Sequence, residues 1–252
     1  MTRRAASLLG AMLLVAGSMA LSRMLSGIPL VLFGAGVVGL LGIAADNFLY
    51  RPTEEDPAFD PQTLTLWTSP GLLVAAGLWV AQVTPEWVRT PLVLGVTLMA
   101  GALLLGLQGS VMVNEERLYR WGRFAVNLVI YLAAFALFTL IYQTRERSLF
   151  TATGAGLVAL LAGLELFRSS EDANSVVVKL ALLGALIVAE AAWVVNYWPV
   201  GGLAGGALLL LSFYVFAGLL QAVQEGGLDR RVVIEYGSVG AVGLLAISWA
   251  LP

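Results

Sequence analysis

The sequence predicts an all-α protein, a polytopic bundle of transmembrane helices, and three observations support this prediction. Apolar residues make up 59% of the 252-residue chain and charged residues only 12%, whereas a soluble domain carries about 25% charged residues. Nine apolar segments each reach the length of about 17 residues or more that a helix needs to cross a bilayer. No stretch is polar enough to form a soluble domain, so we expect one membrane domain over residues 1–252.

The apolar segments give the bounds of about nine expected spans. The first follows Arg3 and Arg4 and ends near small residues, as a signal peptide does, but we expect it to be retained as a membrane helix. The spans are expected at residues 5–21, 28–49, 68–84, 91–113, 124–142, 149–167, 175–197, 200–222 and 232–251.

The distribution of basic residues predicts the orientation of these spans. With nine spans, ten of the 14 basic residues fall on the side of the N-terminus. Cytoplasmic loops carry an excess of Lys and Arg. We therefore expect the N-terminus in the cytoplasm and the C-terminus outside.

Spans 3–5 and 7–9 resemble each other at a constant offset of 108 residues. This offset aligns Gln82 with Glu190 and Pro91 with Pro199. A parallel internal repeat explains these matches, and convergence of membrane hairpins on similar residues explains them as well. Pro29, Pro91 and Pro199 are each expected to open a helix, because the first helical N–H has no partner within the helix.

Glycines recur at spacings that allow membrane helices to approach closely. Gly201 and Gly205, Gly202 and Gly206, and the series Gly237, Gly240 and Gly243 are the clearest examples. We expect close helix contacts in spans 2, 8 and 9.

The residue types that are absent exclude several classes of site. The chain has no Cys and no His, which excludes disulfides, thiolate zinc sites, His-ligated haem and Ser-His triads. A net charge of −2 gives no electrostatic footprint for nucleic acid. We find no catalytic, cofactor or metal motif and expect a protein that is not an enzyme.

Glu190 is the most informative polar residue within the expected spans. It lies eight residues before Trp198, which is about 12 Å along a helix, and a charge in the membrane costs about 3 kcal/mol on insertion scales. With Gln82, its counterpart in the repeat, it forms a candidate intramembrane polar site. A proton or cation site and an interhelical hydrogen bond both remain open.

Two further groups of residues are candidates for contacts. Glu165 and Lys179 flank a short turn, and we expect an ion pair between them to offset the cost of burying each charge. Arg117, Arg120 and Arg123 lie beside aromatic residues in segment 114–123, which predicts a short interfacial segment that contacts anionic lipid headgroups.

The C-terminal third contains the stretches A-E-A-A-W-V-V-N-Y-W-P-V-G-G, F-Y-V-F-A-G-L and R-R-V-V-I-E-Y-G. In these motifs, over about residues 185–240, it resembles a group of uncharacterised bacterial multi-pass membrane proteins. The resemblance implies a protein of the bacterial inner membrane. It carries no activity to transfer.

Three functional hypotheses follow. The first is a structural or accessory subunit of a membrane complex, in contact with the lipid bilayer and with other membrane subunits or a second copy of itself. The second is a small proton- or cation-linked transporter or channel that uses Glu190. The third is a membrane enzyme acting on lipids, for which Arg123, Asn127, Glu165, Lys179, Gln221 and Glu235 would be the polar residues; a solvated rim explains this set better.

Overall fold

The computed structural model describes residues 3–25, 33–34, 36–43, 68–112, 116–143, 148–168, 174–224 and 226–249. Within these ranges every regular element is helical, which confirms the all-α prediction. The chain divides into two compact units, Met1–Ile130 and Tyr131–Pro252, and each is described by itself. The prediction of a single domain stays a prediction.

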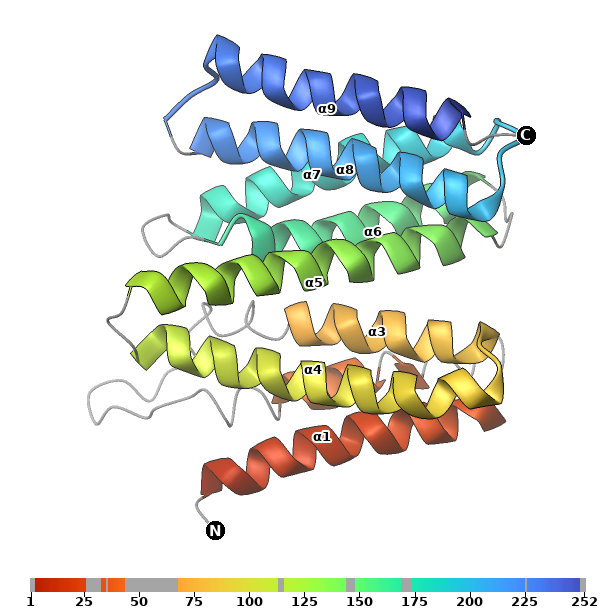
Figure 1. The fold of residues 1–252 in the computed structure, drawn as a ribbon, viewed down its shortest axis with the longest axis vertical. Coiled ribbons are helices and arrows are strands. Elements are labelled where there is room, and N and C mark those ends of the chain that lie inside the picture. Colours follow the sequence, from red (N-terminus) through yellow and green to blue (C-terminus); the bar gives the residue numbers. More distant parts are fainter. Residues whose placement is uncertain are drawn as a thin grey trace. The chain divides into compact units, whose positions relative to one another are not determined.

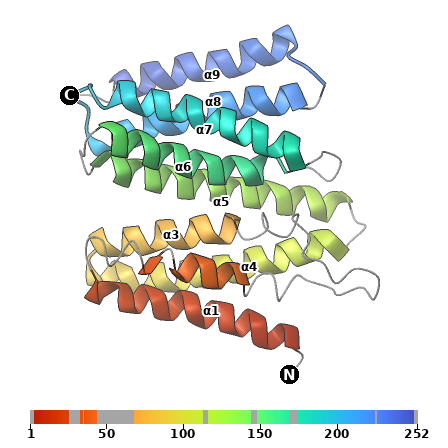
Figure 2. The same ribbon diagram turned by 180° about the vertical axis from the view of Figure 1, so that it is seen from behind.

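The first unit contains three long helices with their connections. Helices α1 (Arg3–Leu21), α3 (Thr68–Val83) and α4 (Glu86–Met112) pack against one another, and a 3₁₀ turn, Ser22–Met24, follows α1. Figure 2 shows α1 and α3 on either side of α4. Residues 36–43 are also helical; the rest of the expected span 28–49, with Pro29, lies outside the described residues except for 33–34.

The second unit is built from consecutive helices that run back and forth beside one another (Figure 1). It begins within α5 (Glu116–Gln143) and continues through α6 (Ser148–Leu166), α7 (Asn174–Val195), α8 (Gly202–Gln224) and α9 (Arg230–Trp249). Helix α7 packs against α6 and α8, and α9 packs against α8. Gly226 and Gly227 connect α8 to α9 at φ angles of 137° and 126°, a backbone conformation that side chains rarely allow.

Five of the described helices are long and apolar enough to cross a membrane: Arg123–Gln143, Ser148–Leu166, Ser175–Val195, Gly202–Gln224 and Arg230–Trp249. At 1.5 Å per residue, the shortest of these five, with 19 residues, is about 28 Å long, close to the thickness of the hydrocarbon core. The protein is therefore membrane-embedded. The number of spans, their orientation and the repeat stay predictions.

Two helices, α4 and α5, begin more than a turn earlier than the sequence indicated. Helix α4 starts at Glu86, so Pro91 lies inside it rather than at its first position. Helix α5 starts at Glu116 and is continuous, so segment 114–123 is largely its first turns rather than a separate interfacial segment. Pro199 does lie in the turn before a helix, three residues ahead of Gly202. Charged and polar residues can extend a membrane helix beyond the hydrocarbon, which hydropathy alone does not reveal.

Glycines of α8 produce the closest helix contacts in the second unit. A β-carbon at Gly205 would overlap the ring of Tyr142, and one at Gly206 would overlap Thr139, both on α5. On another side of α8, a β-carbon at Gly218 would overlap the ring of Tyr236 of α9. The expected close contacts of span 8 are therefore present.

The other glycine series behave unevenly. On α9, a β-carbon at Gly243 would come within 2.7 Å of the Leu211 side chain, whereas one at Gly237 would meet no atom within 4 Å. In the expected second span, Gly36 and Gly39 likewise have open space around them among the described residues. Spacing alone thus identified glycine faces without telling which of them carry a contact.

Candidate functional site

Glu190 lies at the edge of a hollow between α6 and α7. The hollow has a volume of about 460 Å³ and is lined by Leu149, Ala152, Thr153, Leu186, Ala189, Glu190, Trp193 and Val194. Its walls are almost entirely apolar, and Glu190 is the one charged residue among those that line it. The side chain of Glu190 is exposed.

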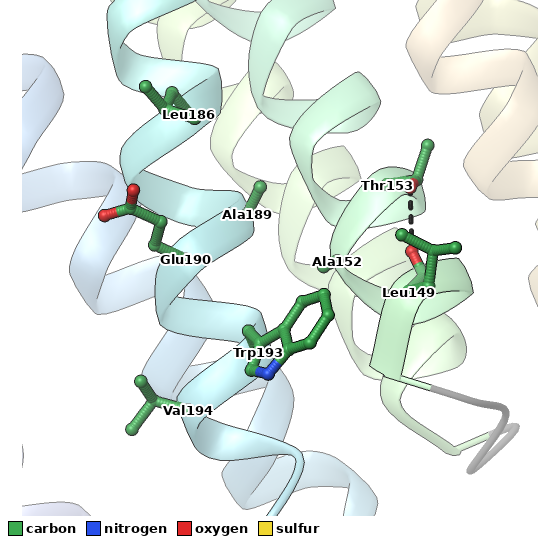
Figure 3. Close-up of a pocket in the computed structure, with 8 residues that line it drawn as sticks. All are labelled: Leu149, Ala152, Thr153, Leu186, Ala189, Glu190, Trp193 and Val194. Carbon is green, nitrogen blue, oxygen red and sulfur yellow. Dashed lines mark hydrogen bonds between the residues drawn. The ribbon is translucent and has the colours of Figure 1, made fainter.

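Figure 3 shows how these side chains are arranged. Ala189 and Trp193 extend from α7 toward α6, whereas the Glu190 carboxylate turns away from α6 and lies at the rim. The Thr153 hydroxyl donates a hydrogen bond of 2.7 Å to the Leu149 carbonyl of its own helix. The carboxylate is therefore the polar group of this site that is presented outward.

Gln82 belongs to the first unit and has its own partner there. Its Nε2 donates a hydrogen bond of 2.9 Å to the backbone carbonyl of Ser22. This bond joins α3 to the turn that ends α1, at a carbonyl that also accepts a hydrogen bond of 3.2 Å from the Leu25 amide. The structure thus shows a structural contact for Gln82; its association with Glu190 stays a prediction.

Glu165 has a different partner from the one that the sequence suggested. Its carboxylate is fully buried and lies 2.6 Å from the Arg168 guanidinium, three residues further along the chain. Lys179 is exposed on α7. Helix α6 ends at Leu166. The chain beyond it places the Arg168 guanidinium beside the last turn of the helix, where it pairs with the Glu165 carboxylate. The sequence contained this alternative, since i and i+3 positions of a helix are neighbours.

The same end of α6 is held by α8. Gln221 Nε2 donates to the carbonyl of Leu166 at 3.1 Å, and Gln224 Nε2 donates to the carbonyl of Phe167 at 2.9 Å. Both acceptors belong to the end of a helix, where carbonyls lack intrahelical donors. Gln221 therefore has a capping role; the lipid-acting enzyme for which it was considered stays a prediction.

Contacts with α5 and α6 hold the C-terminal end of α7 and the turn that follows it. The buried Tyr142 hydroxyl lies 3.0 Å from the carbonyl of Val195 and 2.9 Å from that of Trp198. Asn196 Nδ2 donates to Ser148 Oγ at 2.9 Å. Aromatic residues are common at span ends, so the sequence carries no signal that distinguishes Tyr142.

An aromatic series crosses the second unit and was not predicted. The ring of Tyr131 on α5 lies 5.8 Å from that of Phe213 and 5.6 Å from that of Tyr214, both on α8. The ring of Tyr214 lies 5.7 Å from that of Tyr236 on α9. These are favourable separations for aromatic pairs. They fix α9 to α8 at one point, where Gly218 makes room for the Tyr236 ring.

The arginines proposed for lipid headgroups are described only in part. Arg123 is half-buried on α5. The side chains of Arg117 and Arg120 lie outside the described residues. Contacts of all three with lipid stay predictions.

A family model matches residues 8–250. The chain belongs to the DUF5656 family, proteins of unknown function. This confirms the expected membership of an uncharacterised family and extends it from the C-terminal third to nearly the whole chain. No match was found among the curated proteins or the solved structures.

The DUF5656 membership brings no assigned chemistry, so the site must be interpreted from its own groups. Among the residues that the structure describes, no three acidic side chains cluster in a way that would hold a metal ion. In the second unit, Gln221, Gln224 and Tyr142 contact carbonyls at helix ends, and Glu190 stands exposed at the rim of an apolar hollow. Such an arrangement can organise helices and can attract a cationic group.

Proposed function

We propose that this DUF5656 protein is a structural or accessory subunit of a complex in the bacterial inner membrane and has no catalytic activity. The observation that carries this proposal is α9. It has the length and apolarity of a membrane span, yet none of its residues is buried. Its described helix contact is with α8.

A partner's transmembrane helix on the outward side of α9 would give it a second neighbour. Large apolar side chains are available there, with Val242 65% and Leu245 70% exposed. Glu235 and Ser238 are also exposed on this helix. Polar side chains and small residues favour helix association in lipid, where close packing and hydrogen bonds provide the attraction.

Transport of a proton or cation through Glu190 is the alternative. It requires a water-filled path to the carboxylate. The hollow at Glu190 has apolar walls and only one charged group, which fits contact with lipid or protein better than passage of an ion. A lipid-acting enzyme has still less support, since Gln221 caps α6.

Native mass spectrometry of the protein, extracted from its own membrane with minimal detergent, tests the proposal. We expect the chain to appear with at least one other polypeptide in a fixed ratio. The double variant Val242→Trp with Leu245→Trp should lose that polypeptide, and Leu13→Trp, at a 73% exposed position of α1, should retain it. A lone monomer in mild conditions would contradict the subunit role and justify a flux assay with Glu190→Gln.

A further inference from the structure

The α6–α7 hollow combines an apolar strip with a single outward carboxylate near one end of its helices. Glu190 lies five residues before α7 ends at Val195, about 7.5 Å along the helix axis. Around the same end, Trp193, Tyr197 and Trp198 are 44%, 71% and 47% exposed. Exposed Trp and Tyr residues gather where hydrocarbon meets headgroups. The carboxylate is thus within about two turns of the headgroup region.

The charge in this hollow selects the chemistry of its occupant. A carboxylate within a membrane-spanning helix is costly unless a donor pairs with it. Among the residues that line the hollow, none is basic. A primary ammonium carries three donors and a positive charge, and an anionic headgroup would be repelled. The apolar walls, from Leu149 and Ala152 on α6 to Leu186 and Ala189 on α7, suit an acyl chain.

We propose that the hollow is a binding site for an aminophospholipid, with the ammonium group at the Glu190 carboxylate and an acyl chain along the strip between α6 and α7. The exposed indole of Trp193 borders the strip where the chain joins its headgroup. This site is separate from the outward side of α9 and does not depend on the proposed subunit role.

Native mass spectrometry of the full chain from nanodiscs with equal amounts of phosphatidylethanolamine and phosphatidylglycerol tests the site. The wild-type protein should retain phosphatidylethanolamine in preference to phosphatidylglycerol. Glu190→Gln should lower that preference by about fivefold, as expected for a partly exposed ion pair. Asp229→Asn removes another exposed carboxylate, in the turn before α9, and should leave the preference unchanged.

A second variant tests the acyl chain independently of charge. Thr153 is exposed at the hollow, so Thr153→Trp should fill the strip without disturbing the fold, and it should also reduce retention of the lipid. Soluble phosphoethanolamine in excess should not compete, because it lacks the chain. Equal lipid preference in the wild type and Glu190→Gln, full retention in Thr153→Trp, or effective competition by the soluble headgroup would overturn the proposal.

Discussion

Helices α6 and α9 are similar in length and apolar character but differ completely in their surroundings. Helix α6 has 19 residues and α9 has 20. Ten residues of α6 are buried, including a charged one, whereas none of α9 is. Hydropathy therefore predicts that a segment enters the membrane and does not predict its place in the bundle. That place is set by small residues opposite large ones and by polar groups that find partners.

The largest effect is expected at the buried charge of α6. Arg168→Ala leaves the Glu165 carboxylate buried without its ion pair, and breaking such a pair costs about 3 kcal/mol. Thermal unfolding in detergent should show a clear loss of stability. Lys179→Ala, at an exposed position, should change the stability by less than about 0.5 kcal/mol. A larger loss of stability in Lys179→Ala than in Arg168→Ala would indicate that Glu165 pairs with Lys179 instead.

The next largest effect is expected where α8 approaches α5. Gly206→Ala introduces a β-carbon that overlaps Thr139, and overpacking of this kind costs about 1–3 kcal/mol. Gly237→Ala on α9, where a β-carbon meets open space, should be neutral or slightly stabilising because Ala favours the helix. Equal effects of the two substitutions on the unfolding temperature would show that the α5–α8 contact is looser than described.

A smaller effect is expected from a single hydroxyl. Tyr142→Phe removes the group that lies within hydrogen-bond distance of the Val195 and Trp198 carbonyls. The cost should be about 1 kcal/mol, the net contribution of a typical hydrogen bond, and Tyr197→Phe at an exposed position should cost nothing measurable. Hydrogen exchange of the α7–α8 turn should rise in Tyr142→Phe alone; unchanged exchange would contradict its role.

The smallest effect on stability is expected from α9 itself. Leu245→Ser changes a 70% exposed side chain and should leave the free energy of unfolding of the isolated protein within about 0.5 kcal/mol of the wild-type value, as measured by thermal unfolding. A large loss would mean that α9 is held within this chain by more than its contact with α8.

The sequence predicted much of the helical framework because apolar length is a strong local signal. Spans 149–167 and 175–197 differ from α6 and α7 by only one or two residues at each end. The sequence did not predict that α4 begins at Glu86 and α5 at Glu116, because polar residues form the first turns of both helices. It also did not predict that Pro91 lies inside α4, near the start of that helix.

The candidate site was harder to predict because its features depend on neighbours in three dimensions. Glu190 was identified by its cost in the membrane, but its exposure and the hollow beside it require knowledge of where α6 lies. The choice of Arg168 over Lys179 depends on where α6 ends. The aromatic series from Tyr131 to Tyr236 joins three helices, and a single sequence carries no signal for it.

Photo-cross-linking in the native membrane tests whether α9 contacts another polypeptide. A photoreactive residue would replace Leu245 on α9 or Leu186 on α7, which are 70% and 57% exposed. We expect a cross-link to another polypeptide from position 245 and cross-links to lipid alone from position 186. Lipid adducts alone from position 245 would contradict the role of α9 as a subunit contact.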